Sequence, residues 1–385
     1  MLTEQILLTE DGNWLRPSDN PIDAQLVFLF AASSIIESPL LLERIRTRYP
    51  RAHTVAVSAP DNIAGDGVLE KGGSTTALRF DTARIEVASE VLRGRDDSER
   101  TGEALGSKIP RDDLRHVIIF SEGIEVNGTA LLRGIKNVLG ASVSVTGGLA
   151  SDGEAFKRTT VGLDEIPAPN RAVAVGLYGK SLSIGKGSIG GWIPFGEEMK
   201  ITRSEGNVAY ELGGRSALQV YRDVLGPKAF ALPASGLLFP LGIQVPGGGD
   251  PLVRTLLSID AASESVSFAG DVPQGYTARL MRADLDNLIT AAESAASNAA
   301  TTLGPPGAGA SLVLVISCIG RKLVLQRRTD EEIRAARMAF GSSATFAGFY
   351  SYGEISPWNE LEECQLHNQT MTITAISESV FPATG

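Results

Sequence analysis

The sequence predicts an α+β fold, in which helices pack on mainly antiparallel or mixed β-sheets, and two domains. Segments with strand patterns are followed by helical patterns in both halves of the chain. Residues 143–212 form a series of short extended runs separated by glycines, as in an antiparallel sheet. With 385 residues, 43% of them apolar, the chain is long enough for two substantial cores. We place an N-terminal domain at residues 24–214 and a C-terminal domain at residues 215–385.

Local patterns predict the individual elements. In the N-terminal half we expect a strand–helix–strand unit over 24–58, a hairpin that pairs 75–80 with 84–88, and a solvated loop over the charged residues 94–103. A helix after the strand 116–121 is capped by Asn127 and stopped by Gly140. In the C-terminal half we expect strands at 237–243, 252–259, 276–281 and 311–317. Helices are expected at 216–225 and 284–302. Thr329 and Glu332 form a candidate capping box.

Charge and hydropathy exclude several classes of protein. Lys and Arg total 35 against 45 Asp and Glu, a net charge of -10, so nucleic acid and anionic membrane surfaces are not expected partners. The longest apolar stretches are far shorter than the ~18 residues of a membrane span, and the acidic N-terminus lacks the start of a secretory signal. The two cysteines, Cys318 and Cys364, exclude a disulfide framework. We therefore expect a cytoplasmic protein.

One short motif invites a nucleotide-binding interpretation and fails on context. The segment GKGSIG places Gly185, Gly187 and Gly190 at the spacing of a dinucleotide-binding loop. Such a loop must lead into a helix, whose N-terminus binds the pyrophosphate, but Gly191, Trp192 and Pro194 follow instead. Glycine turns between strands are the better interpretation.

A group of polar and aromatic residues in the C-terminal half is the candidate ligand-binding site. These residues follow predicted buried strands, whose ends open onto clefts, and they are Cys318, Arg321, Tyr350, Tyr352, Glu354, His367 and Asn368. Arg321 suits either a surface salt bridge or the anchoring of a carboxylate or phosphate. His367 suits either a hydrogen-bonded core position or a haem axial ligand.

The same region resembles a known family. The segments VLVISCIGR (313–321), AGFYSYGEI (347–355) and LHNQT (366–370) resemble the C-terminal FIST domain, while GGLASDG (147–153) and GWIPFG (191–196) are similar to the N-terminal FIST domain. The resemblance spans about residues 24–376. It implies a sensory module, not an enzyme, that binds a small molecule and signals to a partner such as a histidine kinase or a cyclic-di-GMP enzyme.

The resemblance leaves the ligand open. Some stand-alone members of the family are haem-binding nitric-oxide sensors, and here a non-covalent haem would use one of His53, His116 and His367, with His367 as the candidate axial ligand. The alternative is an amino-acid-like metabolite, held by Arg321 and Glu354. The family's Gly-Cys-Ser-Thr-type segment after the second strand is replaced here by residues 58–61. Ligand contacts assigned to that segment in the family therefore do not transfer.

A third hypothesis comes from enzyme chemistry. Cys318 as nucleophile, His367 as base and Glu354 as the orienting carboxylate would form a thiol-hydrolase arrangement. This hypothesis requires the three side chains to lie within hydrogen-bond reach of one another.

Overall fold

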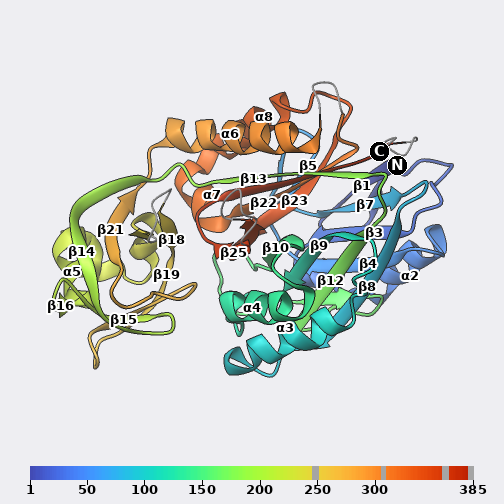
Figure 1. The fold of residues 1–385 in the computed structure, drawn as a ribbon. Coiled ribbons are helices and arrows are strands. Elements are labelled where there is room, and N and C mark those ends of the chain that lie inside the picture. The colour runs from blue at the N-terminus through green and yellow to red at the C-terminus, as the bar shows by residue number, and fades with distance from the viewer. Residues whose placement is uncertain (245–250, 305–308, 358–363, 380–385) are drawn as a thin grey trace.

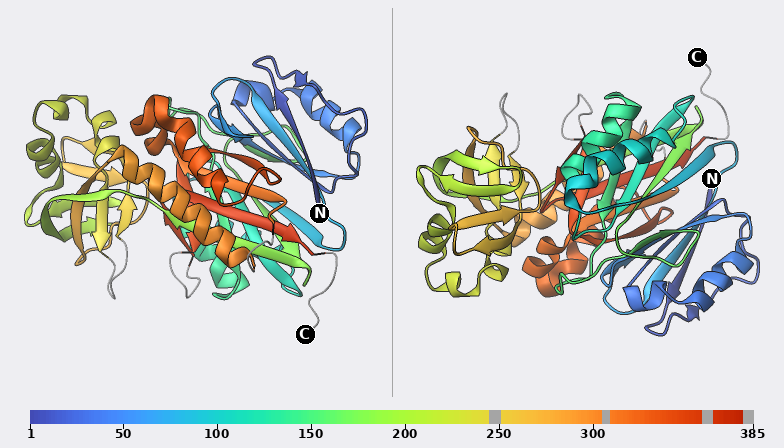
Figure 2. Two further views of the ribbon diagram at one scale, coloured as in Figure 1. Left: turned by 90° about the horizontal axis from the view of Figure 1, so that it is seen from above. Right: turned by 90° about the horizontal axis from the view of Figure 1, so that it is seen from below.

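A computed structural model of the chain describes residues 1–244, 251–304, 309–357 and 364–379. Figure 1 shows a large body, built from both ends of the chain, and a small body built from residues 193–282. The large body contains three six-stranded sheets, and the small body contains one eight-stranded sheet. Helices lie on the outer faces of these sheets, as the views in Figure 2 show. The prediction of an α+β fold is confirmed.

In all three large-body sheets the spatial order of the strands differs from their order in the chain. Across sheet A lie β11 (Val161–Leu163), β4 (His53–Ser58), β3 (Leu26–Ala31), β7 (Gly73–Arg79), β1 (Leu2–Leu8) and β2 (Trp14–Leu15). Across sheet C lie β25 (Cys364–His367), β24 (Gly353–Pro357), β10 (Ser144–Leu149), β9 (Leu114–Ser121), β12 (Arg171–Tyr178) and β8 (Arg84–Val91). Across sheet B lie β6 (Gly67–Leu69), β5 (Asn62–Ala64), β23 (Thr345–Ser351), β22 (Leu312–Cys318), β26 (Met371–Glu378) and β13 (Leu182–Ile189).

The three sheets share one strand arrangement. Each has a central parallel pair joined through helices, namely β3 with β4, β9 with β10 and β22 with β23. In each sheet the first strand of that pair has an antiparallel neighbour on its other side, namely β7, β12 or β26. The large body is therefore a set of three similar units, although the sequence shows no fixed-period repeat.

Each unit contributes at least one strand to the sheet of another unit. Strand β5 follows β4 in the chain but pairs with β23, and β11 follows β10 but pairs with β4. Strand β24 follows β23 but pairs with β10. The exchange is cyclic, so residues before and after position 214 share sheets B and C. The predicted boundary at this position lies inside the small body, between β15 (Val208–Leu212) and β16 (Arg215–Ser216).

The centre of the large body is apolar and aromatic. One phenylalanine from each sheet meets there: the ring centroid of Phe349 lies 5.0 Å from that of Phe30 and 6.1 Å from that of Phe120. All three side chains are fully buried, which makes this cluster a main source of stability.

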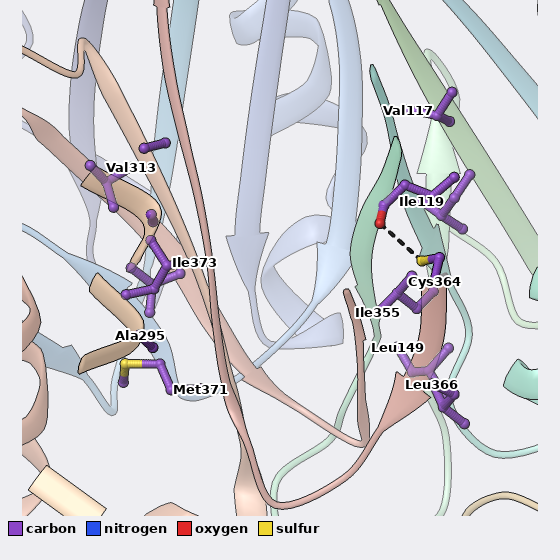
Figure 3. Packing of buried hydrophobic residues seen from close by; sticks show 14 of the residues in the cluster. Val117, Ile119, Leu149, Ala295, Val313, Ile355, Cys364, Leu366, Met371 and Ile373 are labelled. Atoms are coloured by element: carbon purple, nitrogen blue, oxygen red, sulfur yellow. Dashed lines mark hydrogen bonds between the residues drawn. The ribbon is translucent and has the colours of Figure 1, made fainter. Parts of the chain in front are cut away.

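A second cluster lies between sheets B and C. Figure 3 shows Ile119, Ile355 and Cys364 on one side of it and Val313 and Ile373 on the other. The Cys364 thiol donates a hydrogen bond to the carbonyl of Val145 at 3.0 Å.

The longest helix explains the glycines of the GKGSIG segment. Helix α6 (Leu285–Leu303) packs on β13, and a Cβ atom at Gly185 or Gly187 would lie 2.0 or 1.9 Å from a carbonyl oxygen of α6. Glycine is required because the helix and the strand approach so closely. Gly185 and Gly187 lie within strand β13 and no helix follows the segment, so the rejection of a nucleotide-binding loop agrees with the structure. The prediction of glycine turns between strands is wrong, because these glycines serve the close approach of α6 inside a strand.

Two strands connect the small body to the large body. Strand β14 (Ile193–Glu205) leads into it and β21 (Thr277–Arg282) leads back to α6, and the two strands pair with each other. Its sheet has the order β18 (Leu252–Arg254), β17 (Leu241–Gln244), β21, β14, β15, β20 (Ser265–Phe268) and β19 (Leu256–Asp260), with β16 beside β15. Helix α5 (Ala217–Leu225) and the short helices η2 (Gly226–Ala231) and η3 (Ala234–Leu238) complete the body.

Several local predictions are confirmed. The strand–helix–strand unit over 24–58 forms as β3, α2 (Pro39–Arg48) and β4, and three helices follow their end signals. Helix α4 (Gly128–Leu139) begins after Asn127, whose side chain accepts a hydrogen bond from the amide of Ala130, and it ends at Gly140. Helices α5 and α6 also lie within one residue of the predicted bounds.

Other local predictions are wrong. Strands β7 and β8 belong to different sheets, because each has a longer partner elsewhere. The charged stretch 94–103 is helical, with η1 (Arg95–Asp97) followed by α3 (Ser98–Ser107), because one face of α3 packs on α4. In helix α8 (Thr329–Met338) no capping box forms, since Glu332 binds Arg321 instead.

Candidate functional site

A pocket of about 400 Å³ lies at the junction of the two bodies. We call it the junction pocket. Its lining includes the start of α4 and the turn that precedes β15, two segments whose backbone can be followed in Figure 1. Its large-body wall is formed by Arg95, Asp96, Gly123, Ile124, Val126, Asn127, Gly128, Leu149, Phe156 and Tyr352. Its small-body wall is formed by Gly206, Asn207, Leu257, Ser258, Phe268, Ala269 and Gly270. A cavity of this size and mixed lining suits a small organic ligand.

Two stacked aromatic rings form part of the large-body wall. The rings of Tyr352 and Phe156 are nearly parallel, with centroids 4.4 Å apart and planes 7° apart. The Tyr352 hydroxyl accepts hydrogen bonds from the amides of Asp152 and Phe156 at 3.3 Å. It can donate a hydrogen bond to the Asp152 carboxylate or to the carbonyl of Gly153. Burial, followed by the Asp152 carboxylate, raises the pKa of this phenol. Tyr352 therefore stays neutral and holds the loop that carries Phe156.

Charged and polar groups surround this aromatic wall. Arg95 and Asp96 are both exposed at the pocket, and the Arg95 guanidinium donates to the carbonyl of Ile124 at 2.8 and 3.2 Å. Gly128, the first residue of α4, also lines the pocket, so the positive end of this helix lies there. A cation, a carboxylate and a helix N-terminus beside stacked rings can hold a ligand that has both a charged and a planar part.

A buried arginine lies behind the small-body wall. Arg254, at the end of β18, is 1% exposed, and its Nε donates to the carbonyl of Asp271 at 3.0 Å. Its Nη1 donates to the carbonyl of Leu366 in the large body at 2.9 Å. Gly270 lies directly against it, since a Cβ atom there would be 2.9 Å from the arginine Nε.

The residues predicted as ligand contacts mostly lie behind the pocket. Glu354 is fully buried; it accepts from the Ser351 hydroxyl at 2.5 Å and from the amide and hydroxyl of Thr370 at 3.1 and 3.0 Å. Burial raises its pKa to about 8, although these hydrogen bonds act in the opposite direction. Asn368 donates to the carbonyl of Tyr352 at 3.4 Å, which connects this group to the aromatic wall.

Arg321 is bound to a carboxylate of the chain itself. It is fully buried, and its Nε and Nη2 donate to Glu332 at 3.0 and 2.8 Å. Tyr350 donates to the other oxygen of Glu332 at 2.6 Å, and the carbonyls of Leu288 and Gly190 also accept from Arg321. This closed network leaves Arg321 neutralised by Glu332 rather than exposed to a ligand.

Cys318 and His367 are both buried in states that disfavour catalysis. Burial, followed by the nearby Glu354 charge, raises the pKa of the Cys318 thiol, so the reactive thiolate is disfavoured. The His367 Nε2 lies 3.1 Å from the carbonyl of Ser356, and burial lowers the pKa of this imidazole to about 4. No hydrogen bond joins Cys318, His367 and Glu354 among the described residues of the chain.

The surroundings of the histidines do not fit a haem. His367 is 5% exposed and His116 is fully buried, with its Nε2 2.8 Å from the Thr146 hydroxyl. His53 lies at the surface and pairs with Asp164 at 2.6 Å. None of the three is among the described residues that line the junction pocket.

Comparison with known proteins identifies the family. Residues 25–215 match the FIST N domain, and residues 217–357 match the FIST C domain. The chain belongs to the FIST family. FIST domains are signal-transduction sensors of small ligands.

The chain is also similar to individual proteins, at about 30% identity over part of its length. The FIST chain is 30% identical over 223 residues to an uncharacterized protein of Mycobacterium tuberculosis, which covers 56% of each chain. It is 31% identical over 173 residues to an uncharacterized protein of Mycobacterium bovis, which covers 43% of each. The FIST chain thus spans about half the length of the curated relatives it matches. A crystal structure of cyanuric acid hydrolase from A. caulinodans aligns over 99% of both chains with 8% identity and a TM-score of 0.39.

The sequence pointed to one wall residue of the pocket and missed the others. Of the predicted ligand contacts only Tyr352 lines the junction pocket of the FIST chain. Phe156 lies three residues after the end of the GGLASDG segment, which was a usable signal for a functional loop. The sequence suggested a solvated loop at Arg95 and a helix cap at Asn127, but no ligand contact at either residue. No sequence pattern singled out Arg254. Within the described residues no helix is both long and apolar enough to cross a membrane.

Proposed function

We propose that the chain is a small-ligand sensor that holds an amino-acid-like metabolite with a planar side group in the junction pocket. The observation that carries the proposal is the position of this pocket, which has one wall on each body. A ligand that contacts both walls changes the free energy of one arrangement of the bodies relative to others, which is how binding becomes a signal.

The lining suggests the chemistry of the ligand. The stacked rings of Tyr352 and Phe156 offer a flat surface for a planar group. Arg95 and the N-terminus of α4 suit a carboxylate, and Asp96 suits an amine. Aromatic amino acids combine these three features, so L-phenylalanine is the first compound to test.

Haem and nitric oxide form the competing proposal for the ligand. It rests on the similarity to stand-alone family members, while the surroundings of His53, His116 and His367 argue against it. The output partner in either case is proposed to be a separate protein, such as a histidine kinase or a cyclic-di-GMP enzyme. A cytoplasmic location agrees with such partners.

The deciding experiment is a thermal-shift screen of the purified chain with the proteinogenic amino acids, together with an absorption spectrum. We expect L-phenylalanine or a related compound to raise the melting temperature, and Phe156→Ala to weaken binding about 3- to 10-fold through loss of aromatic contact. Phe230→Ala is the matched control, because Phe230 is 97% exposed in the small body.

Two results would count against this proposal. An unchanged melting temperature with every amino acid would remove the metabolite assignment. A Soret band in the purified protein, or after addition of haem, would favour the haem proposal instead.

A further inference from the structure

Side-chain hydrogen bonds join the two bodies, and one of them involves a wall residue of the junction pocket. The Asn127 side-chain amide donates to the Asp271 carboxylate at 3.4 Å, and the Gln369 side-chain amide donates to the carbonyl of Leu237 at 3.2 Å. Arg254 adds the contact with Leu366. All three contacts join a residue of the large body to one of the small body.

Arg254 differs from the other contacts because it carries a charge into the interior. No carboxylate lies within 4 Å of its guanidinium among the described residues, and it donates instead to the carbonyls of Val253, Asp271 and Leu366. Within the described part of the chain its hydrogen bonds go to carbonyls alone, and a buried cation held in this way is costly unless each hydrogen bond is kept. Separation of the bodies would remove the bond to Leu366 and would leave Arg254 only with small-body partners.

The pocket wall rests directly on this arginine. Gly270 lines the pocket, and the absence of a side chain there lets the guanidinium lie against its backbone. The next residue, Asp271, accepts from Arg254 through its carbonyl and from Asn127 of the opposite wall through its carboxylate. A ligand that presses on Gly270 therefore acts on the same groups that hold the bodies together.

We infer that Arg254 is the positioning residue that couples occupancy of the junction pocket to the relative position of the two bodies. The inference rests on the proposed function for the identity of the site, but the mechanical role of Arg254 is testable without a ligand. Leu366 and Gln369 belong to the LHNQT segment, so this family segment takes part in the contact between the bodies.

The test is a distance measurement by pulsed electron paramagnetic resonance on the full 385-residue chain. Spin labels are attached through Phe230→Cys in the small body and Met338→Cys in α8 of the large body, which are 97% and 79% exposed. The native Cys318 and Cys364 are buried and escape labelling. We expect one narrow distance distribution in this parent, and a broader, displaced distribution after Arg254→Met.

The matched control is Arg279→Met, because Arg279 lies in the same small-body sheet but pairs with Glu198 of that body. Circular dichroism reports whether each variant is folded. Arg254→Lys is a second variant, which keeps the charge but not the fork that reaches two carbonyls, and it should also broaden the distribution. Unchanged distributions in both folded Arg254 variants would overturn the inference.

A second arm adds L-phenylalanine. If it raises the melting temperature and shifts the distance in the parent but not in Arg254→Met, coupling is supported. If it raises the melting temperature and leaves the parent distance unchanged, coupling fails and the sensor proposal stands. If it does not bind, L-phenylalanine is excluded as the ligand, the screen of the other amino acids decides the metabolite proposal, and the ligand-free comparison still decides the role of Arg254.

Discussion

Tyr352 and Phe156 form a stacked pair in which one residue also fixes the loop of the other. The rings lie 4.4 Å apart, and the Tyr352 hydroxyl accepts from the amide of Phe156. The pair belongs to segments almost 200 residues apart in the chain. Its geometry therefore depends on the tertiary structure and on one atom, the hydroxyl oxygen of Tyr352.

Removal of the Tyr352 hydroxyl should loosen the pocket wall. We expect Tyr352→Phe to lower the free energy of unfolding by about 1–2 kcal/mol, because buried loop groups lose their partner. It should also weaken L-phenylalanine binding several-fold, measured by calorimetry. Tyr210→Phe is the control, since no hydrogen bond of the Tyr210 hydroxyl occurs within the described residues. Equal affinities for the two variants would show that the loop is held by other contacts.

Glu354 should make the protein less stable at higher pH. Its pKa is raised to about 8 in the folded chain, against 4.5 when exposed. Between these values the folded state keeps a proton that the unfolded state has released, so the free energy of unfolding decreases as pH rises from about 5 to 8. Urea denaturation at pH 5, 6.5 and 8 should show a smaller decrease for Glu354→Gln. Glu293→Gln, at an exposed position of α6, should retain the decrease; parallel curves for all three proteins would refute this role.

The buried histidines should make the protein sensitive to acid. Burial lowers the pKa of His116 to about 3 and that of His367 to about 4, against 6.5 when exposed. As pH falls below about 6.5, the unfolded chain binds protons that the folded chain cannot accept, so stability is lost. The variant His116→Gln should lose less stability between pH 7 and pH 4.5. His53→Gln, at the surface, should behave like the parent; if it alone resists acid, the buried imidazoles are not responsible.

The ion pair of Arg321 and Glu332 should be sensitive to loss of one partner. Glu332→Gln leaves the guanidinium buried without a carboxylate, which costs about 3–5 kcal/mol of unfolding free energy. The double variant Arg321→Met with Glu332→Leu should recover part of that loss. Glu331→Gln removes a surface pair with Arg328 and should cost at most about 1 kcal/mol. Similar losses for Glu331→Gln and Glu332→Gln would argue against a special role of burial.

Helices were predictable where their end signals are local. Asn127 and Gly140 bound α4, and Gly226 ends α5, so a few neighbouring residues decide the outcome. Helix α3 was missed because its charged residues suggest a loop. Gly102 is the informative residue there: a Cβ atom at this position would lie 2.1 Å from the carbonyl of Leu131 in α4. Contacts of this kind depend on residues distant in sequence.

The candidate site was predictable only in part for the same reason. The FIST segments do converge, since the amide of Cys318 donates to the carbonyl of Thr370 and Glu354 accepts from Thr370. Residues of these segments are buried by contacts with the small body, such as that of Gln369 with Leu237, and by the ion pair of Arg321 with Glu332. No local sequence pattern predicts these contacts. The junction pocket combines residues from positions 95 to 352, and only the folded chain brings them together.

The cyclic strand exchange has a consequence for how the protein is made. Strand β5 leaves the ribosome early, but its partner β23 begins about 280 residues later. Until β23 is made, the edge of β5 that pairs with it exposes unpaired backbone groups that favour aggregation, and β4 likewise has an open edge until β11 is made. We therefore expect slow folding that completes only after release of the C-terminal segment, and a dependence on chaperones during synthesis that a chain of three separate sheets would not have.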